Sequence, residues 1–105
     1  MKEYYVYILS NKLNGVLYIG VTSDIIKRVW QHKQKIIKGF TTKYNLDKLV
    51  YFEQFNDINY AINREKRLKE YKRKWELDLI EANNPNWHDL YYKIILIRSR
   101  DQVAG

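Results

Sequence analysis

The amino-acid sequence predicts one domain of the α+β class, layered from a small sheet and amphipathic helices. Stretches rich in aromatic and β-branched residues at positions 4–9, 16–21 and 49–55 are typical of strands. The segments after the second and third stretches have apolar residues at helical spacing. The chain has 105 residues, 46% of them apolar, which is enough for one hydrophobic core. We expect residues 1–92 to form the domain and residues 93–105 to form a tail whose structure the pattern does not define.

Residues 4–9 and 16–21 are predicted to pair as an antiparallel hairpin, because a short loop with an Asn-Gly turn separates them. Side chains alternate along a strand, so Tyr18 and Gly20 share one face of the second strand. If Tyr7 lines the same side of the hairpin, two phenols converge beside the bare backbone at Gly20. The alternative is a cross-strand aromatic pair that only stabilises the sheet, by up to about 1 kcal/mol. The pattern alone favours neither interpretation.

The first helix is predicted to begin with Ser23 or Asp24 as its N-cap and to run to about Ile37, with Gly39 as its stop signal. Helical spacing divides this segment into two neighbouring stripes, one cationic and one facing the core. The cationic stripe contains Arg28, His32 and Lys35, and the core stripe contains Val29, Trp30 and Ile37. A strand that carries a tyrosine and leads into a cationic helix stripe could surround a phosphate.

Residues 40–55 are predicted to form a polar loop and then the third strand. Four side chains of the loop, over residues 40–47, could donate hydrogen bonds to phosphates: Thr41, Thr42, Lys43 and Tyr44. Loops are polar for many reasons, so the pattern favours an ordinary loop over a binding site. The strand at residues 49–55 is followed by Asn56-Asp57, which is predicted to cap a second helix that begins at Ile58.

Glu65 breaks the apolar pattern of the second predicted helix. The inward stripe of this helix contains Ala61 and Leu68, and Glu65 falls inside that stripe. A carboxylate in such a position is seldom buried without a partner, so it either pairs with a cation or binds a metal ion. An ion pair with Lys69, one helical turn later, fits the spacing as well as a metal site does.

Positive charge is concentrated in residues 64–74, where seven Lys or Arg residues stand against two Glu residues. This local net charge of +5 makes up most of the chain's +7. Such a run is usually a solvated helix face, but its share of the excess charge favours contact with a phosphate backbone. No Gly or Pro interrupts residues 58–82, so the pattern fits one long helix or two helices with a bend near residues 72–74.

The sequence after this bend is predicted to pack again and then to leave the helical state. Trp75, Leu79 and Ile80 indicate renewed packing. The Asn83-Asn84-Pro85 sequence ends the helical part, because residues before a proline avoid the α region. Residues 89–92 could add one more turn, and the apolar stretch after residue 92 could pack on the domain or pair with another chain.

Composition narrows the functional class. The chain lacks cysteine, which excludes disulfides and cysteine-ligated zinc or iron–sulfur sites. No apolar run approaches the ~20 residues of a membrane span, and the first residues contain no signal-peptide core. We therefore expect a soluble, cytoplasmic protein without membrane partners. The net charge of +7 and the pI near 9.5 indicate a polyanionic partner, such as a nucleic acid.

Several motifs, in a fixed order, resemble the GIY-YIG endonuclease family. Tyr5-Val6-Tyr7 is similar to the first motif, and Tyr18-Ile19-Gly20 is the second, with Tyr18 eleven positions after Tyr7. Further matching positions follow them along the chain: Arg28, His32, Glu65 and Asn84-Pro85. Within the family, the chain resembles small single-domain bacterial proteins similar to the N-terminal domain of the DNA-repair excinuclease. The match runs from about Tyr4 to Leu90 and implies a three-stranded antiparallel sheet flanked by helices, with a one-metal nuclease site on the sheet face.

The resemblance also implies a role for each matched residue. Tyr7 and Tyr18 would hold or deprotonate the attacking water. Arg28 would neutralise the scissile phosphate, and His32 would assist proton transfer or bind the phosphate. A free phenol has a pKa near 10, so a tyrosine base needs cationic neighbours to lower that pKa.

Glu65 would hold a divalent ion, Mg²⁺ or Mn²⁺, and Asn84 would brace the site near it. A single carboxylate supplemented by waters suits Mg²⁺, and no small-molecule cofactor is implied. The residues predicted to contact nucleic acid lie in the motifs and the basic segments: Gly20, Lys35, Thr42, Lys43, Arg67, Lys69, Lys72 and Lys74.

The sequence departs from the family pattern where Tyr5-Val6 replaces Gly-Ile of the first motif. Because Tyr7 is kept, we expect the chemistry to survive while the bulkier Tyr5 narrows the cleft. We expect no separate DNA-reading module, so the expected substrate is branched, damaged or single-stranded DNA that arises in repair or recombination. The expected oligomeric state is a monomer or a homodimer. One alternative is a nucleic-acid-binding module with little or no catalysis. Another is a basic protein that docks on a protein or ribosomal partner.

Overall fold

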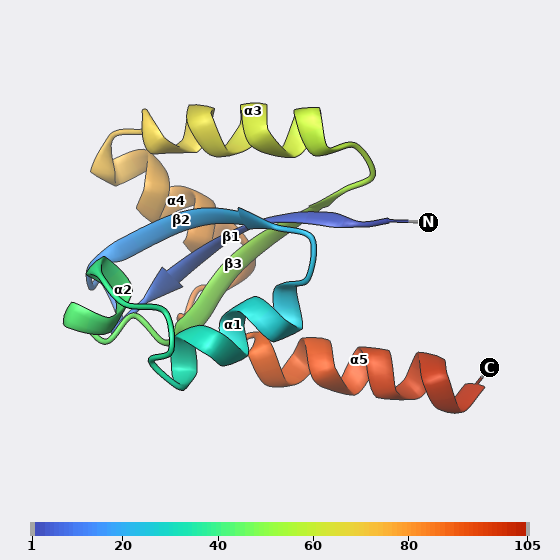
Figure 1. The fold of residues 1–105 in the computed structure, drawn as a ribbon. Helices are drawn as coiled ribbons and strands as arrows, with labels where there is room; N and C mark the ends of the chain where they lie inside the picture. Colours follow the sequence, from blue (N-terminus) through green and yellow to red (C-terminus); the bar gives the residue numbers. More distant parts are fainter. Residues whose placement is uncertain (1, 105) are drawn as a thin grey trace.

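A three-stranded antiparallel sheet with helices on both faces forms the body of the protein (Figure 1). The computed structural model describes residues 2–104, with side chains described for residues 2–98. The strands are β1 (Tyr4–Ser10), β2 (Leu17–Thr22) and β3 (Lys48–Phe55). The helices are α1 (Ile25–Lys33), α2 (Phe40–Lys43), α3 (Ile58–Lys69), α4 (Arg73–Asn83) and α5 (Tyr91–Ala104). The predicted fold class and the predicted hairpin are therefore confirmed.

The strand order is β2-β1-β3, which places the aromatic first strand in the centre. In the hairpin, Tyr7 pairs with Gly20 and Leu9 pairs with Tyr18. On the other side Tyr7 pairs with Phe52, and an irregularity in the β1–β3 register follows Ile8. A central strand is covered on both faces, which explains why this strand is aromatic or aliphatic from Tyr4 to Leu9.

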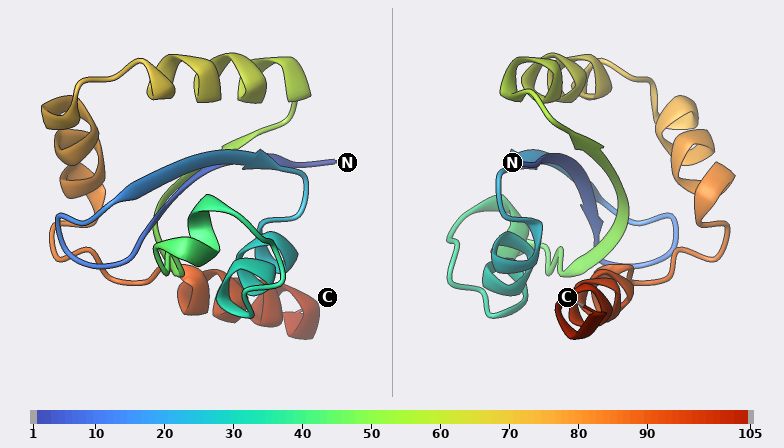
Figure 2. Two further views of the ribbon diagram at one scale, coloured as in Figure 1. Left: turned by 60° about the vertical axis from the view of Figure 1, so that its left-hand side comes forward. Right: turned by 90° about the vertical axis from the view of Figure 1, so that its right-hand side faces the viewer.

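The alternation of side chains along β1 divides the core into two clusters. Tyr5, Tyr7 and Leu9 face the cluster on the α1 and α5 side of the sheet. Val6 and Ile8 face the opposite cluster, which contains residues of α3 and α4. Figure 2 shows α3 above the sheet and α1 and α5 below it. The sheet therefore separates the helix that carries Glu65 from the helix that carries His32.

Helix α1 ends four residues earlier than predicted. Lys35 has a φ of 57°, and its N–H donates to the His32 carbonyl at 3.1 Å. The N–H of Ile36 donates to the Gln31 carbonyl at 3.1 Å, so the helix closes in a Schellman motif with a lysine at the left-handed position. Gly39, which was predicted to stop this helix, instead precedes α2 as its N-cap. The predicted loop at residues 40–47 thus contains one helical turn.

The core stripe of α1 also differs from the prediction. Ile25, Val29 and His32 are buried, at i, i+4 and i+7, whereas Trp30 is 45% exposed. His32 therefore occupies a core position and is not part of an exposed cationic stripe. Lys35 lies beyond the helix end, so the stripe predicted to include it does not form.

The basic segment, residues 64–74, is divided between two helices. Of the two predicted possibilities, one long helix or two helices with a bend, the second is therefore correct. Helix α3 ends at Lys69 and α4 begins at Arg73, with Lys72 as its N-cap. Asp57 caps α3, as predicted. Ile80 is fully buried, but Trp75 is 50% exposed and packs its ring edge-on against Tyr71.

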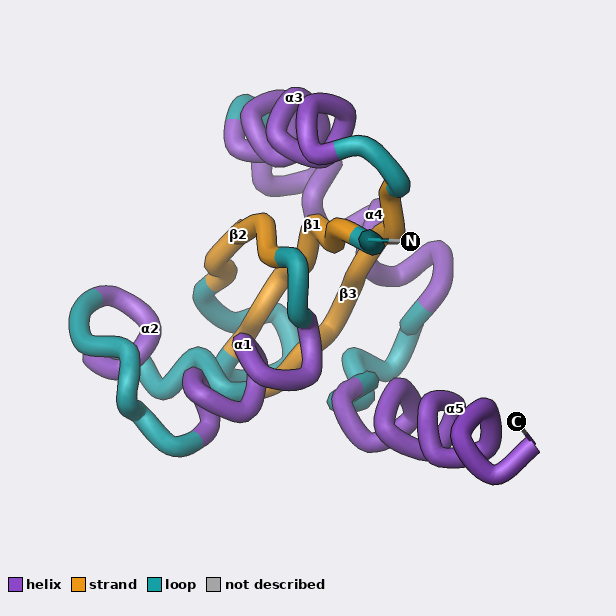
Figure 3. Tube along the Cα trace, turned by 45° about the vertical axis from the view of Figure 1, so that its right-hand side comes forward, coloured by secondary structure: helices purple, strands orange, loops and turns teal. Residues whose placement is uncertain are grey.

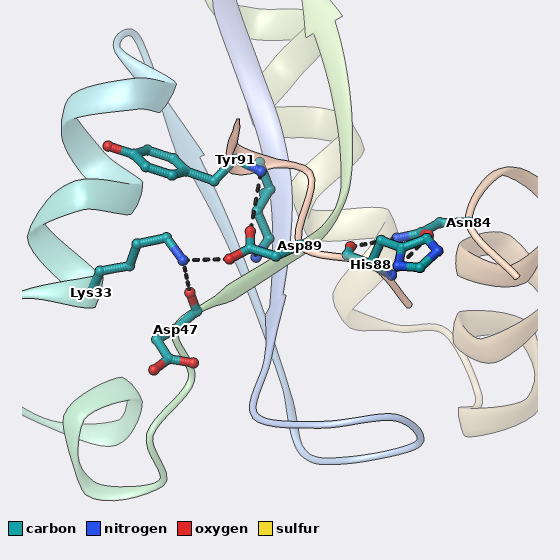
Figure 4. A network of polar contacts seen from close by, with 7 residues as sticks. Lys33, Asp47, Asn84, His88, Asp89 and Tyr91 are labelled. Carbon is teal, nitrogen blue, oxygen red and sulfur yellow. Dashed lines mark hydrogen bonds and ion pairs between the residues drawn. The ribbon is translucent and has the colours of Figure 1, made fainter. Parts of the chain in front are cut away.

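The segment after residue 90 forms α5, and the predicted boundary at residue 92 falls inside this helix. Its first turn is anchored by Asp89, which accepts hydrogen bonds from the N–H of Leu49 at 3.2 Å and of Tyr91 at 3.1 Å. Lys33 forms an ion pair with Asp89 and donates to the Asp47 carbonyl at 2.8 Å (Figure 4). Among residues 2–104, no helix has the length and apolar character needed to cross a membrane.

Candidate active site

Tyr7 is the centre of the site, and Gly20 is the residue that makes room for it. The Tyr7 ring is 1% exposed and lies over the backbone of its hairpin partner. A Cβ placed on Gly20 would come within 2.6 Å of both Cζ and the hydroxyl oxygen of Tyr7. Only glycine fits here without a shift of the phenol. Gly20 was predicted to contact nucleic acid, and it is buried beside Tyr7. A contact of its backbone with nucleic acid stays a prediction.

A chain of side-chain hydrogen bonds connects Tyr7 to α1 and α2 through His32. The Tyr7 hydroxyl lies 3.2 Å from Nε2 of His32, and Nδ1 of His32 lies 3.1 Å from the Thr41 hydroxyl. Burial and the nearby Arg28 charge lower the pKa of His32 from 6.5 to about 4. The imidazole is therefore neutral at pH 7, and one ring nitrogen accepts a hydrogen bond while the other donates.

Tyr18 and Arg28 complete the surroundings of the Tyr7 phenol. The ring centroids of Tyr7, Tyr18 and His32 are 5.8–6.2 Å apart and tilted, so the three rings form one cluster. Burial raises the pKa of Tyr7, and the positive charge of Arg28 opposes this rise. Tyr7 is therefore protonated at neutral pH. The two phenols do converge, as the alternation of the strands predicted.

Glu65 lies on α3, the helix that packs on the opposite side of the sheet from His32. The Glu65 charge adds the smallest of the contributions to the raised pKa of Tyr7, after burial and the effects of Tyr18 and Arg28. The Glu65 side chain is 17% exposed, and its Oε2 lies 3.4 Å from the ammonium of Lys69. The predicted Lys69 pair is therefore present. No group of three or more His, Asp or Glu side chains that could hold a metal ion is found among the described residues.

Glu65 fits a weakly held divalent ion. Mg²⁺ keeps several of its waters and commonly uses only one or two carboxylates together with phosphate oxygens. The Lys69 side chain is 53% exposed and its distance to Glu65 is long for an ion pair, so this lysine can turn away. One half-buried carboxylate beside open solvent is thus a donor set that suits Mg²⁺ or Mn²⁺.

Asn84 lies apart from the cluster, on the outer edge of β3. Its side-chain amide donates to the carbonyls of Val50 at 3.1 Å and His88 at 2.8 Å, and its Oδ1 accepts from the His88 N–H at 3.0 Å (Figure 4). These bonds hold the loop after α4 against the sheet. A part for Asn84 in the chemistry stays a prediction.

The other residues predicted to contact nucleic acid have different environments. Thr42 donates its hydroxyl to the Ile37 carbonyl, so this group is engaged inside the protein. Lys69 is paired with Glu65. The remaining predicted contacts are exposed cations: Lys35, Lys43, Arg67, Lys72 and Lys74. The ammonium of Lys72 lies 5.5 Å from the Trp75 ring centroid.

Two contacts beside the site could not be predicted from the sequence pattern. Thr41 was predicted only as a loop donor, and nothing in the spacing links it to His32. Arg64 donates from Nε and Nη2 to the two carboxylate oxygens of Glu53, at 2.8 Å each. This bidentate pair fixes α3 to β3 one residue before Glu65, and it removes Arg64 from the exposed basic run.

Comparisons with known proteins show which family the chain resembles. The family model described as the GIY-YIG catalytic domain matches residues 3–86. A UPF0213 protein of Staphylococcus saprophyticus is 35% identical over 80 residues, which cover 76% of this chain and 96% of that protein. A UPF0213 protein of Clostridium perfringens is 36% identical over 80 residues, with coverage of 76% and 85%. The solution NMR structure of a UPF0213 protein of Bacillus halodurans shares the fold, with a TM-score of 0.53 at 24% identity over 83% of this chain and 92% of that chain.

Proposed function

The chain belongs to the GIY-YIG family, and on this basis we propose that it is an endonuclease that hydrolyses DNA phosphodiester bonds with a divalent metal ion. One observation carries the proposal. A buried phenol, Tyr7, lies 3.2 Å from Nε2 of a buried histidine and beside a second phenol, Tyr18, and the charge of Arg28 opposes the rise of its pKa. A purely structural tyrosine pair would not need a histidine held between one phenol and the Thr41 hydroxyl.

Tyr7 and His32 form a path for the proton of the attacking water. If Nδ1–H of His32 donates to Thr41, its Nε2 lone pair accepts the Tyr7 hydroxyl proton. The Tyr7 oxygen can then take a proton from water as its own proton passes to His32, and the hydroxide oxygen attacks phosphorus. Tyr18 is only half-buried, so its hydroxyl can hold this water from the solvent side.

The substrate itself would make His32 a better base. The low pKa of His32 reflects burial and the Arg28 charge. A bound phosphate places negative charge beside Arg28, which weakens this repulsion and favours the imidazolium. Proton transfer is thereby tied to the presence of the phosphodiester.

Arg28 and Glu65 would both stabilise the negative charge of the phosphate, Arg28 directly and Glu65 through a bound metal ion. Arg28 is half-buried, which strengthens its interaction with a phosphate whose charge grows during attack. Glu65 would hold Mg²⁺ or Mn²⁺, which supplies charge stabilisation at the phosphate when bound.

The substrate class follows from what surrounds the site. The exposed cations of α3 and α4 offer contacts to phosphates, which position DNA without reading its sequence. We therefore infer a structure-selective enzyme that acts on branched, damaged or single-stranded DNA in repair or recombination.

Incubation of the pure protein with plasmid, branched and single-stranded DNA, in Mg²⁺ or in EDTA, tests this function. We expect cleavage of at least one substrate in Mg²⁺ and none in EDTA. Binding without cleavage of any substrate would replace the proposal with a nucleic-acid-binding module. Neither binding nor cleavage would point to a protein or ribosomal partner.

A further inference from the structure

Helix α2 presents two aromatic rings to solvent beside the candidate site. Phe40 is 48% exposed and Tyr44 is 40% exposed, and their ring centroids are 4.9 Å apart. The ammonium of Lys43 lies 5.4 Å from the Tyr44 ring centroid. Figure 3 shows the loop that carries α2 projecting on the β2 side of the sheet. Neither ring takes part in the proton path described above.

The exposure of the rings does not come from a loose loop. Thr41, which lies between Phe40 and Tyr44 in sequence, is 6% exposed and contacts His32. Leu46 is 1% exposed, and its N–H donates to the Thr41 carbonyl at 2.8 Å. One side of this segment is therefore fixed in the core, and the opposite side holds the rings in the solvent.

The charge around the rings indicates what they contact. Residues 25–46 contain no Asp or Glu, and their cations are Lys27, Arg28, Lys33, Lys35, Lys38 and Lys43. An exposed aromatic pair among lysines is the combination that binds single-stranded nucleic acid, since rings stack on bases and lysines meet phosphates. A paired base offers no free face to such a ring, because it stacks on its own neighbours.

We propose that Phe40 and Tyr44 form a stacking platform for an unpaired base next to the scissile phosphate. The platform is joined to the site through Thr41, whose hydroxyl lies 3.1 Å from the histidine that contacts Tyr7. A base stacked there keeps its strand at the cluster while the lysines contact the flanking phosphates. The inference rests on the proposed function, because it names the substrate that this site selects: DNA with unpaired nucleotides.

Binding of a single-stranded oligonucleotide that contains 2-aminopurine tests the platform, in EDTA so that no strand is cut. Emission from this base is quenched when it stacks. We expect quenching by the wild-type protein, and loss of quenching with about fivefold or weaker affinity in Phe40→Leu and Tyr44→Leu. Affinity for the matching duplex should change by less than twofold, and melting temperatures should stay at the wild-type value.

Tyr60→Leu is the matched control, because Tyr60 is a 69% exposed aromatic residue on α3. It should bind and quench like the wild type. Equal losses in the control, or equal losses on duplex and single strand, would overturn the platform. Unchanged quenching in both ring variants would also overturn it, even in a protein that cuts DNA. Retained quenching by a wild type that cuts nothing in Mg²⁺ would reject the proposed nuclease and support the binding surface.

Discussion

Gly20→Ala is predicted to destabilise the protein by displacing Tyr7. The new Cβ would lie 2.6 Å from two atoms of the phenol, whereas ordinary contacts begin near 3.4 Å. Tyr7 is 1% exposed and lies between two other strands, so it cannot turn into solvent. Overpacking of this kind costs about 1–3 kcal/mol. In a domain of this size the melting temperature should fall by roughly 5–20 °C.

The same displacement should disturb the proton path. The Tyr7 hydroxyl is 3.2 Å from Nε2 of His32, so a shift of a few tenths of an ångström already lengthens this bond beyond hydrogen-bond distance. Cleavage by Gly20→Ala should therefore be lost at temperatures where the variant remains folded. Circular dichroism at the assay temperature establishes the folded fraction.

A double-mutant cycle isolates the contact. Tyr7→Leu removes the three Tyr7 atoms that the alanine would meet, so Gly20→Ala should cost much less stability in that background. Tyr18→Leu is the control, because none of the atoms nearest to the added Cβ belongs to Tyr18. The reasoning is refuted if Gly20→Ala melts within a degree of the wild type, or if Tyr7→Leu leaves the penalty unchanged.

The remaining predictions concern charged and titratable groups. His32 has a pKa of about 4 in the fold, against 6.5 when unfolded, so the fold favours its neutral form. Its contribution to the free energy of unfolding is complete above pH 6.5. This contribution, up to about 3 kcal/mol, is lost as the pH falls toward 4. Urea unfolding between these pH values should show this slope in the wild type and not in His32→Gln. Arg28→Ala should slow single-turnover cleavage by about 3–4 kcal/mol while leaving the Kd for DNA nearly constant; equal losses in both would make Arg28 a backbone anchor. Arg67→Ala combined with Lys74→Ala should reduce the slope of log K against log salt by about 1.8 on duplex DNA, and an unchanged slope would remove α3 and α4 from the DNA contact.

Local patterns predicted the sheet well, because the determinants of the strands lie within a few residues. Alternation along residues 4–9 and 16–21 was enough to bring Tyr7, Tyr18 and Gly20 to one face. The role of Gly20 was not predicted, because alternation says which face a residue shares and not whether another side chain fills that face. The absence of a side chain at Gly20 leaves room for the Tyr7 ring.

The charge state of His32 could not be predicted from the helical spacing of the residues. Its stripe in α1 was predicted to be cationic because Arg28 and Lys35 share the helical phase. Burial makes His32 neutral, and a helix end at Lys33 removes Lys35 from the stripe. Burial of His32 depends on tertiary contacts. The helix end was missed because a lysine in the left-handed position gives no composition signal of it.

Composition also overestimated the positive charge of residues 64–74 that is available to bind DNA. Residues 64–74 carry a local net charge of +5, but Arg64 is bound to Glu53 and Arg73 donates to the carbonyls of Asn14 and Gly15. These pairings join segments far apart in sequence. The charge left for DNA is therefore smaller than the composition of the segment indicates.

Single-turnover cleavage by wild type and Glu65→Gln, on the substrate that the wild type cuts best, tests the central claim most directly. Among the residues with described side chains, Glu65 pairs with one partner, the half-exposed Lys69. Its removal should therefore change stability by less than about 0.5 kcal/mol, and the variant should remain folded and able to bind DNA. The proposed site predicts that Glu65→Gln loses cleavage in both Mg²⁺ and Mn²⁺ at unchanged DNA affinity. Cleavage by Glu65→Gln at the wild-type rate would contradict it.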